Sequence, residues 1–109
     1  MTLIVRQVAI ETIAELAPLA ARIAHHDRSL AQQLRRAASS MALNVGEAEY
    51  SDSGNRKARL HTAAGSASET RTALEVAVAW RYIKLAQAEG ALAGLDRVIG
   101  MLWRLSRGR

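Results

Sequence analysis

Residues 32–48 read QQLRRAASSMALNVGEA and indicate the fold more clearly than any other part of the chain. Apolar side chains recur there at every third or fourth position, which is the spacing of one face of an α-helix: Leu34, Ala37, Met41, Val45 and Ala48. Two arginines, an asparagine and a glutamate interrupt the apolar pattern, but no proline or turn sequence does. We therefore expect an amphipathic helix that carries charged groups beside its buried face.

Three other segments show the same periodicity, so we predict helices at about residues 3–24, 28–49, 54–80 and 85–106. The first has an apolar stripe at Val5, Val8, Thr12, Leu16, Leu19 and Ile23, and Pro18 is expected to kink it near residues 14–17. The stripe of the third helix is Leu60, Ala63, Ala64, Ala67, Leu74, Ala77 and Val78. The stripe of the fourth is Leu85, Ala88, Leu92, Leu95, Ile99 and Leu102.

Two of the three turns are marked by their residues. Asp27 is expected to cap the second helix, and residues 50–55 (YSDSGN) form the clearest loop, with Ser53 as the expected cap of the third helix. The third turn is poorly marked, because residues 80–83 (WRYI) contain neither glycine nor proline and the pattern alone allows one long helix there.

The chain of 109 residues is half apolar, yet it has few aromatic side chains and no phenylalanine, so the core must be aliphatic and rich in alanine. No segment alternates as a strand does. We predict a single all-α domain over residues 1–109, folded as an antiparallel up-down-up-down four-helix bundle. Its apolar surface exceeds what one seam needs, so either the bundle interior takes all of it or an outer face meets another subunit. Gly65 lies in a run of small residues, so we expect a packing reason for it.

The formal charge of +5 suits a polyanion partner, although a charge that only aids solubility explains it at least as well. The absence of cysteine fits the cytoplasm, and we expect no signal peptide and no membrane span. No pattern indicates a catalytic site, a cofactor or a nucleotide loop. A metal site is not expected either, because it would need His25, His26, Asp27 and His61 without a ligand-spaced motif.

Polar groups near the bundle interior have two interpretations. If the second and third helices are antiparallel, Arg35 faces Glu69, Glu47 faces Arg56 or Lys57, and Asn44 lies level with His61. Either a ligand site or a structural network would then consist of Arg35, Arg36, Asn44, Glu47 and Glu69. We favour the network, because buried charges need partners, and in that case Glu69→Ala would destabilise the fold by about 3 kcal/mol.

Basic residues gather at the end of the bundle where the chain terminates. The candidate nucleic-acid contacts are Arg56, Lys57, Arg59, Arg104, Arg107 and Arg109. A solvated tail is the alternative, because cations are also favourable at a helix C-terminus. Glu47, Glu49 and Asp52 share this end and weaken its positive field.

Three ordered motifs carry a family resemblance. Residues 33–40 (QLRRAASS), 43–47 (LNVGE) and 65–69 (GSASE) resemble the "QLRRA", "NIAEG" and "GSxxE" motifs of the four-helix-bundle family of 23S rRNA intervening-sequence proteins. The resemblance covers about residues 8–105. The family's "EG" reads Glu47-Ala48 here, and its "LGY" at the end of the third helix looks like Trp80-Arg81-Tyr82, which places the last turn at about residues 81–84.

The resemblance implies an antiparallel bundle that assembles as a homopentameric ring and has no enzymatic activity. A related branch comprises accessory proteins of diversity-generating retroelements, which work with a reverse transcriptase and nucleic acid. Three hypotheses follow: a scaffold that binds itself and protein or RNA partners, a nucleic-acid-binding module, and a ligand-binding or enzymatic bundle.

Overall fold

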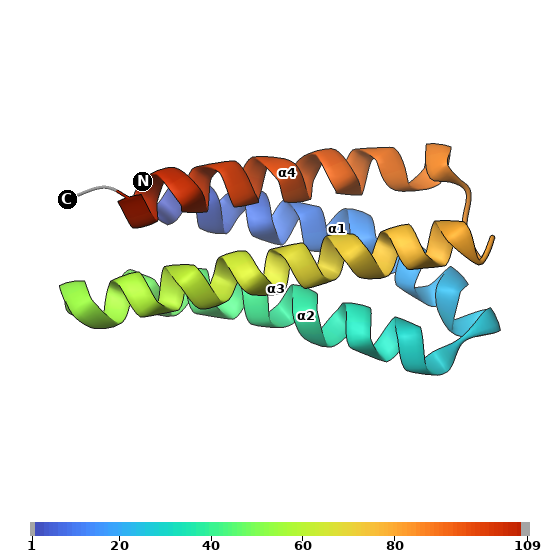
Figure 1. Ribbon diagram of the computed structural model, residues 1–109, viewed down its shortest axis with the longest axis horizontal. Coiled ribbons are helices and arrows are strands. Elements are labelled where there is room, and N and C mark those ends of the chain that lie inside the picture. Colours follow the sequence, from blue (N-terminus) through green and yellow to red (C-terminus); the bar gives the residue numbers. More distant parts are fainter. Residues whose placement is uncertain (1, 108–109) are drawn as a thin grey trace.

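The computed structural model describes residues 2–107 and contains four helices (Figure 1). They are α1 (Thr2–His26), α2 (Arg28–Ala48), α3 (Ser53–Ala79) and α4 (Leu85–Arg107). Each bound lies within two residues of its prediction, and the described residues contain no strand. The all-α four-helix bundle is thereby confirmed.

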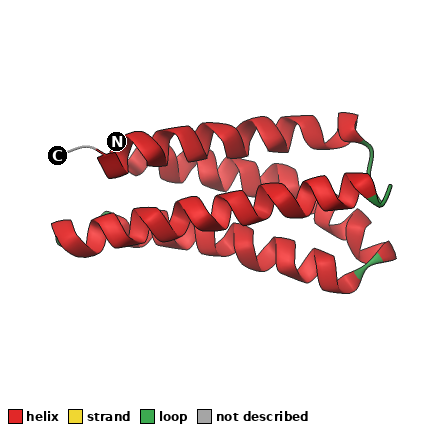
Figure 2. Cartoon of the chain, in the orientation of Figure 1, coloured by secondary structure: helices red, strands yellow, loops and turns green. Residues whose placement is uncertain are grey.

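The helices form a square in which each packs against its neighbours in sequence and α1 also packs against α4. The bundle is elongated, with principal extents of 43 × 22 × 18 Å. The start of α1, the end of α4 and the α2–α3 turn lie at one end, called here the terminal pole, and the other two turns lie at the far pole (Figure 1). Figure 2 shows how short these connections are. Short connections keep consecutive helices antiparallel.

The core is aliphatic, as the composition predicts. The predicted stripe of α1 is buried throughout, and in α2 the buried set includes every predicted stripe residue. In α4 the prediction is partly wrong, because Leu85 is exposed while Ala91, which was not in the predicted stripe, is buried. Heptad spacing drifts around a straight helix, so a strict repeat misplaced the ends of this face.

Pro18 lies inside α1 on the exposed side of the helix. The proline ring removes the hydrogen bond to the carbonyl of Ala14, which is exposed as well, so water can reach that carbonyl. The helix assignment runs through this position without a break. The kink expected there stays a prediction.

Glycine permits a close approach at a position that the sequence did not single out. A Cβ atom at Gly94 of α4 would overlap Oγ1 of Thr12 and lie 3.2 Å from its Cγ2. The Thr12 hydroxyl is buried and donates to the carbonyl of Val8 at 2.8 Å. Gly65, for which a packing reason was expected, has no atom within 4 Å of its would-be Cβ. Within the chain, Gly94 rather than Gly65 brings two helices together.

The caps of α2 and α3 are both aspartates. The backbone N–H of Leu30 donates to Asp27 Oδ1 at 3.0 Å, which confirms the predicted cap. Asp52, not Ser53, caps α3 and accepts from the backbone N–H of Asn55 at 2.9 Å. The helix begins one residue earlier than predicted, which moves the cap back by one. The same hydrogen bond lowers the pKa of the Asp52 carboxyl.

The α3–α4 turn contains a left-handed residue that is not glycine. Arg81 has a φ of 68°. Its N–H donates to Val78 O, and the N–H of Tyr82 donates to Ala77 O, both at 2.9 Å. These two bonds define a Schellman motif, which usually has glycine at the position of Arg81.

Tyr82 fastens this turn to the start of α2. Its ring stacks on His26 with centroids 5.1 Å apart, and its hydroxyl donates to Asp27 Oδ2 at 3.3 Å. Burial raises the pKa of that hydroxyl, and the carboxylate of Asp27 raises it further. Tertiary contacts therefore end α3 where the sequence offers no breaker.

The substitution Arg81→Gly is expected to stabilise the protein by about 0.5–1 kcal/mol, since it removes the steric cost of a left-handed L-residue. Chemical denaturation measures the change. Arg81→Ala is the matched control, because it removes the same side chain and keeps the strained Cβ. Equal stabilisation by both variants would contradict the explanation.

Candidate functional site on the α2–α3 face

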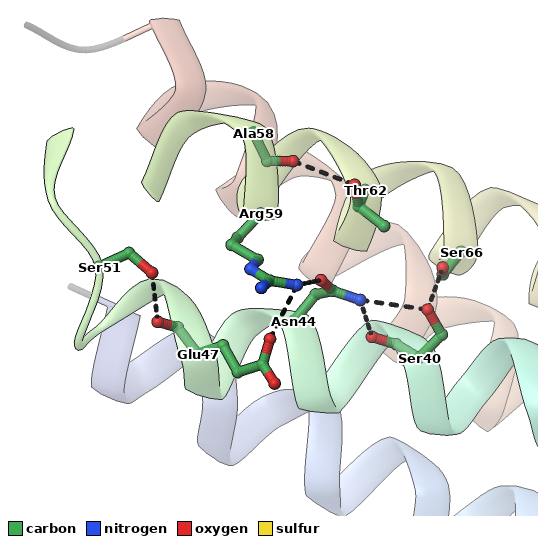
Figure 3. A network of polar contacts seen from close by, with 8 residues as sticks. All are labelled: Ser40, Asn44, Glu47, Ser51, Ala58, Arg59, Thr62 and Ser66. Carbon is green, nitrogen blue, oxygen red and sulfur yellow. Dashed lines mark hydrogen bonds and ion pairs between the residues drawn. The ribbon is translucent and has the colours of Figure 1, made fainter. Parts of the chain in front are cut away.

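Polar side chains form a ladder across α2 and α3 near the terminal pole (Figure 3). The hydroxyl of Ser66 donates to Ser40 Oγ at 2.8 Å. Asn44 Nδ2 donates to the carbonyl of Ser40 at 2.8 Å and lies 3.2 Å from its Oγ. Arg59 Nη1 then donates to Asn44 Oδ1 at 3.3 Å and pairs with Glu47 Oε1 at 2.8 Å. The ladder joins the two helices through hydrogen bonds and one ion pair.

A groove of about 620 Å3 runs along this ladder. Its lining combines charged, hydroxyl and apolar side chains: Gln32, Arg35, Arg36, Ser39, Ser40, Leu43, Asn44, Glu47 and Arg59. Arg35 and Arg36 are exposed, and neither forms an ion pair within the described residues. Arg59 is neutralised by Glu47. The end of the groove at Arg35 and Arg36 therefore carries uncompensated positive charge.

The predicted network is present only in part. Asn44 and Glu47 belong to the ladder, but the partner of Glu47 is Arg59 rather than Arg56 or Lys57. Arg35 and Glu69 are exposed and form no ion pair with each other. The shared rise of two helices gives the level of a residue, but not the direction of its side chain around the helix axis. The expected pairing of Arg35 with Glu69 is therefore absent from the structure.

Ser40, Arg59 and Ser66 complete the ladder, and sequence reasoning did not place them in it. Ser40 and Asn44 are four residues apart on one helix, so their contact was available from spacing. Ser66 lies in the run of small residues on α3, where a short hydroxyl reaches Ser40 directly. Arg59 was assigned to the basic pole instead.

The groove offers donors rather than reactive groups. Guanidinium, amide and hydroxyl groups bind anions, since they present several hydrogen-bond donors in fixed directions. No histidine lines it, and the hydroxyls of Ser40 and Ser66 in the ladder bond to each other. Within the part of the chain that the structure describes, no three histidine, cysteine, aspartate or glutamate side chains gather to hold a metal ion.

The terminal pole brings most of the predicted nucleic-acid contacts together. Arg56 and Lys57 begin α3 there, and Arg104 and Arg107 end α4, as the helix directions in Figure 1 show. The Arg107 guanidinium lies 5.3 Å from the Trp103 ring centroid. Arg59 is bound into the ladder, and Arg109 lies outside the described residues.

One acidic group at this pole is compensated from α1. Arg6 Nη1 lies 3.0 Å from Glu49 Oε1, and that buried oxygen accepts no hydrogen bond of good geometry. The contact is an ion pair that fixes the level of α1 against α2.

Across residues 2–107, no helix has the length and apolar character required to cross a bilayer.

The fold and this face define an antiparallel four-helix-bundle protein with an arginine-bearing groove along two of its helices. The model of the 23S rRNA-intervening sequence protein family matches residues 1–104, and the chain belongs to this family. A crystal structure of a protein of unknown function from the S23 ribosomal protein family of Bacteroides thetaiotaomicron has the same fold, with a TM-score of 0.88 and 20% identity. The match covers 95% of this chain and 99% of that one. No curated protein matches the chain.

The ladder makes a stability prediction that reverses the earlier one for Glu69. Asn44→Ala is expected to lower the free energy of unfolding by about 1 kcal/mol, because it removes the hydrogen bond from Arg59 and the bonds to Ser40. Glu69→Ala, the matched surface control, is expected to change it by less than about 0.5 kcal/mol. Urea denaturation measures both. A loss near 3 kcal/mol for Glu69→Ala would restore the buried pair predicted from sequence.

Proposed function

We propose that the protein is a non-enzymatic scaffold of the cytoplasm that assembles as a homo-oligomeric, pentameric ring and presents surfaces to protein or RNA partners. The observation that carries the proposal is the number of large apolar side chains left exposed on a small bundle. They are Leu3, Ile4, Ile10, Leu43, Tyr50, Val76, Trp80, Leu85 and Trp103. A second copy that covers part of this surface removes it from water, which is the main driving force of association.

The absence of a reaction is part of the proposal and is supported by the chemistry of the groove. Its unpaired charged groups are the guanidinium ions of Arg35 and Arg36, and no nucleophile lies beside a general base there. An anion held by Arg35 and Arg36 would be bound without a group placed to transform it.

The mass of the purified chain in solution tests the assembly. Sedimentation velocity at micromolar concentration is expected to give about five times the chain mass of 11.8 kDa. The apolar driving force predicts that the assembly survives high salt. A monomer at that concentration would refute the assembly, and a different closed oligomer would refute the pentamer alone.

A second function is supported by the basic terminal pole. Arg56, Lys57 and Arg104 lie there and form no ion pair within the described residues. A ring repeats this patch in every subunit, so a weak phosphate contact gains avidity. In this alternative the protein is a nucleic-acid-binding accessory module, for example beside a reverse transcriptase.

Salt dependence distinguishes phosphate contacts from other binding. With structured RNA or duplex DNA, affinity is expected to fall about 100-fold between 50 and 200 mM salt if four phosphates are contacted. The pair Arg56→Glu and Lys57→Glu should weaken binding, whereas Arg97→Glu, at an exposed site in the middle of α4, should not. Binding that is indifferent to salt, or equally weakened by both changes, would exclude the pole as the site.

A further inference from the structure

We infer that neighbouring copies in the proposed ring meet through the outer faces of α1 and α2, with Leu43 and Tyr50 of one copy seated against Leu3, Ile10 and Ala14 of the next. The inference rests on the proposed ring and adds its interface. Four features of the surface support it: an uncovered apolar face on α1, two projecting side chains on α2, the level of both along the bundle, and the charges beside them.

The first observation is that α1 has two uncharged faces. One is the buried stripe, and the other is a narrow uncharged strip on the exposed side, opposite the first and flanked by charged residues. This outer face, called here the α1 crest, consists of Leu3, Gln7, Ile10, Ala14, Ala17 and Ala21. A helix that only covers a core needs one apolar face, so the second indicates a partner.

The α1 crest carries a hollow of the kind that receives a side chain in knobs-into-holes packing, and no side chain occupies it. Leu3, Arg6, Gln7 and Ile10 stand at positions i, i+3, i+4 and i+7, the four positions that receive one side chain of a facing helix. Together with Glu11 they surround a hollow of about 420 Å3 on the surface. Leu3 and Ile10 are more than half exposed, so no side chain of the same chain fills it.

The second observation is a pair of projecting side chains on the outer side of α2. Leu43 is 65% exposed, and Tyr50, just past the end of the helix, is 85% exposed. They are seven residues apart, as are Leu3 and Ile10. Two projecting side chains seven residues apart can enter successive gaps along a facing antiparallel helix, one between Leu3 and Ile10 and the next beyond Ile10.

The third observation is their level along the bundle. The ion pair of Arg6 with Glu49 places Tyr50 at about the level of Val5 and Leu43 at about the level of Thr12. In a ring whose axis runs along the bundle, every copy has the same levels. Tyr50 then meets the next copy between Leu3 and Ile10, and Leu43 meets it between Ile10 and Ala14. Each projecting side chain is then offset from the middle of its gap by at most two residues, which is about 3 Å at a rise of about 1.5 Å per residue.

The fourth observation is charge. Glu15 flanks the α1 crest on the side of α4, where its carboxylate lies over Gly90. Arg36 flanks Leu43 on the side of α3, in the groove that Arg59 also lines. Neither forms an ion pair within the described residues. Glu15 is level with Ser40, one helical turn from Arg36, a distance that an arginine side chain spans.

Ring geometry brings these flanks together. The outer faces of two adjacent helices in a square bundle point about 90° apart, close to the about 108° between the two contact faces of a subunit in a ring of five. In such a ring the α1–α2 side faces the centre. The α4 flank of one copy and the α3 flank of the next then share the outer rim. Diagonal helices such as α1 and α3 point about 180° apart, and contacts between them extend without closing.

The test uses the full chain and a matched pair of variants. Ile10→Glu places a charge in the hole, whereas Leu85→Glu places one at an equally exposed position, since both side chains are 55% exposed. Sedimentation velocity is expected to show monomer for Ile10→Glu and the wild-type oligomer for Leu85→Glu. Circular dichroism checks that both variants stay helical.

Charge reversal tests the pairing independently of the hole. Glu15→Arg and Arg36→Glu are each expected to raise the dissociation constant of the assembly about 10-fold, and the double variant to return it to near the wild-type value. An Ile10→Glu protein that still assembles would overturn this interface but not the ring. So would charge reversals whose effects on the dissociation constant simply add in the double variant. A monomeric wild type would overturn the ring itself.

Discussion

The relative level of the helices is the constraint on which the rest of this structure depends. Arg6 and Glu49 set α1 against α2, the ladder of Ser40, Asn44 and Arg59 sets α2 against α3, and Arg71 sets α3 against α4 through Asp96 at 2.7 Å. Each contact is worth little energy alone, because most of these groups are partly exposed. Their directionality matters more, since a shift of one helical turn would break every one of them.

The core cannot supply that register by itself. Burial of aliphatic surface is non-directional, and many of the buried side chains are alanines, which fit several alignments almost equally well. Only a few core positions restrict the alignment sterically. The clearest is Gly94, where a Cβ atom would overlap Thr12. An apolar core therefore gives this bundle its stability, while polar contacts at its surface select one alignment.

This division explains what the sequence could predict. Helix bounds follow from local periodicity, so they were recovered to within two residues in α1 through α4. The buried stripes of α1 and α2 were recovered too, and that of α4 in part. The levels of Asn44 and Glu47 also followed, because every helix rises equally. The orientation of Arg35 and Glu69, the cap at Asp52 and the left-handed Arg81 did not follow. The Asp52 cap depends on the exact residue at which α3 begins. The other two depend on how one helix turns about its axis or on a tertiary contact such as that of Tyr82 with Asp27.

The motifs that carry the family resemblance separate into two groups once the register is known. Ser40, Asn44, Glu47 and Ser66 are satisfied by contacts inside the chain. Arg35, Arg36 and Glu69 are exposed and form no ion pair within the described residues. A charged side chain that has no ion-pair partner in its own chain can pair with an opposite charge on another molecule. The first group holds the helices in alignment. The second group consists of exposed charges on α2 and α3, and those on α2 lie near Leu43, where the proposed neighbour would bind.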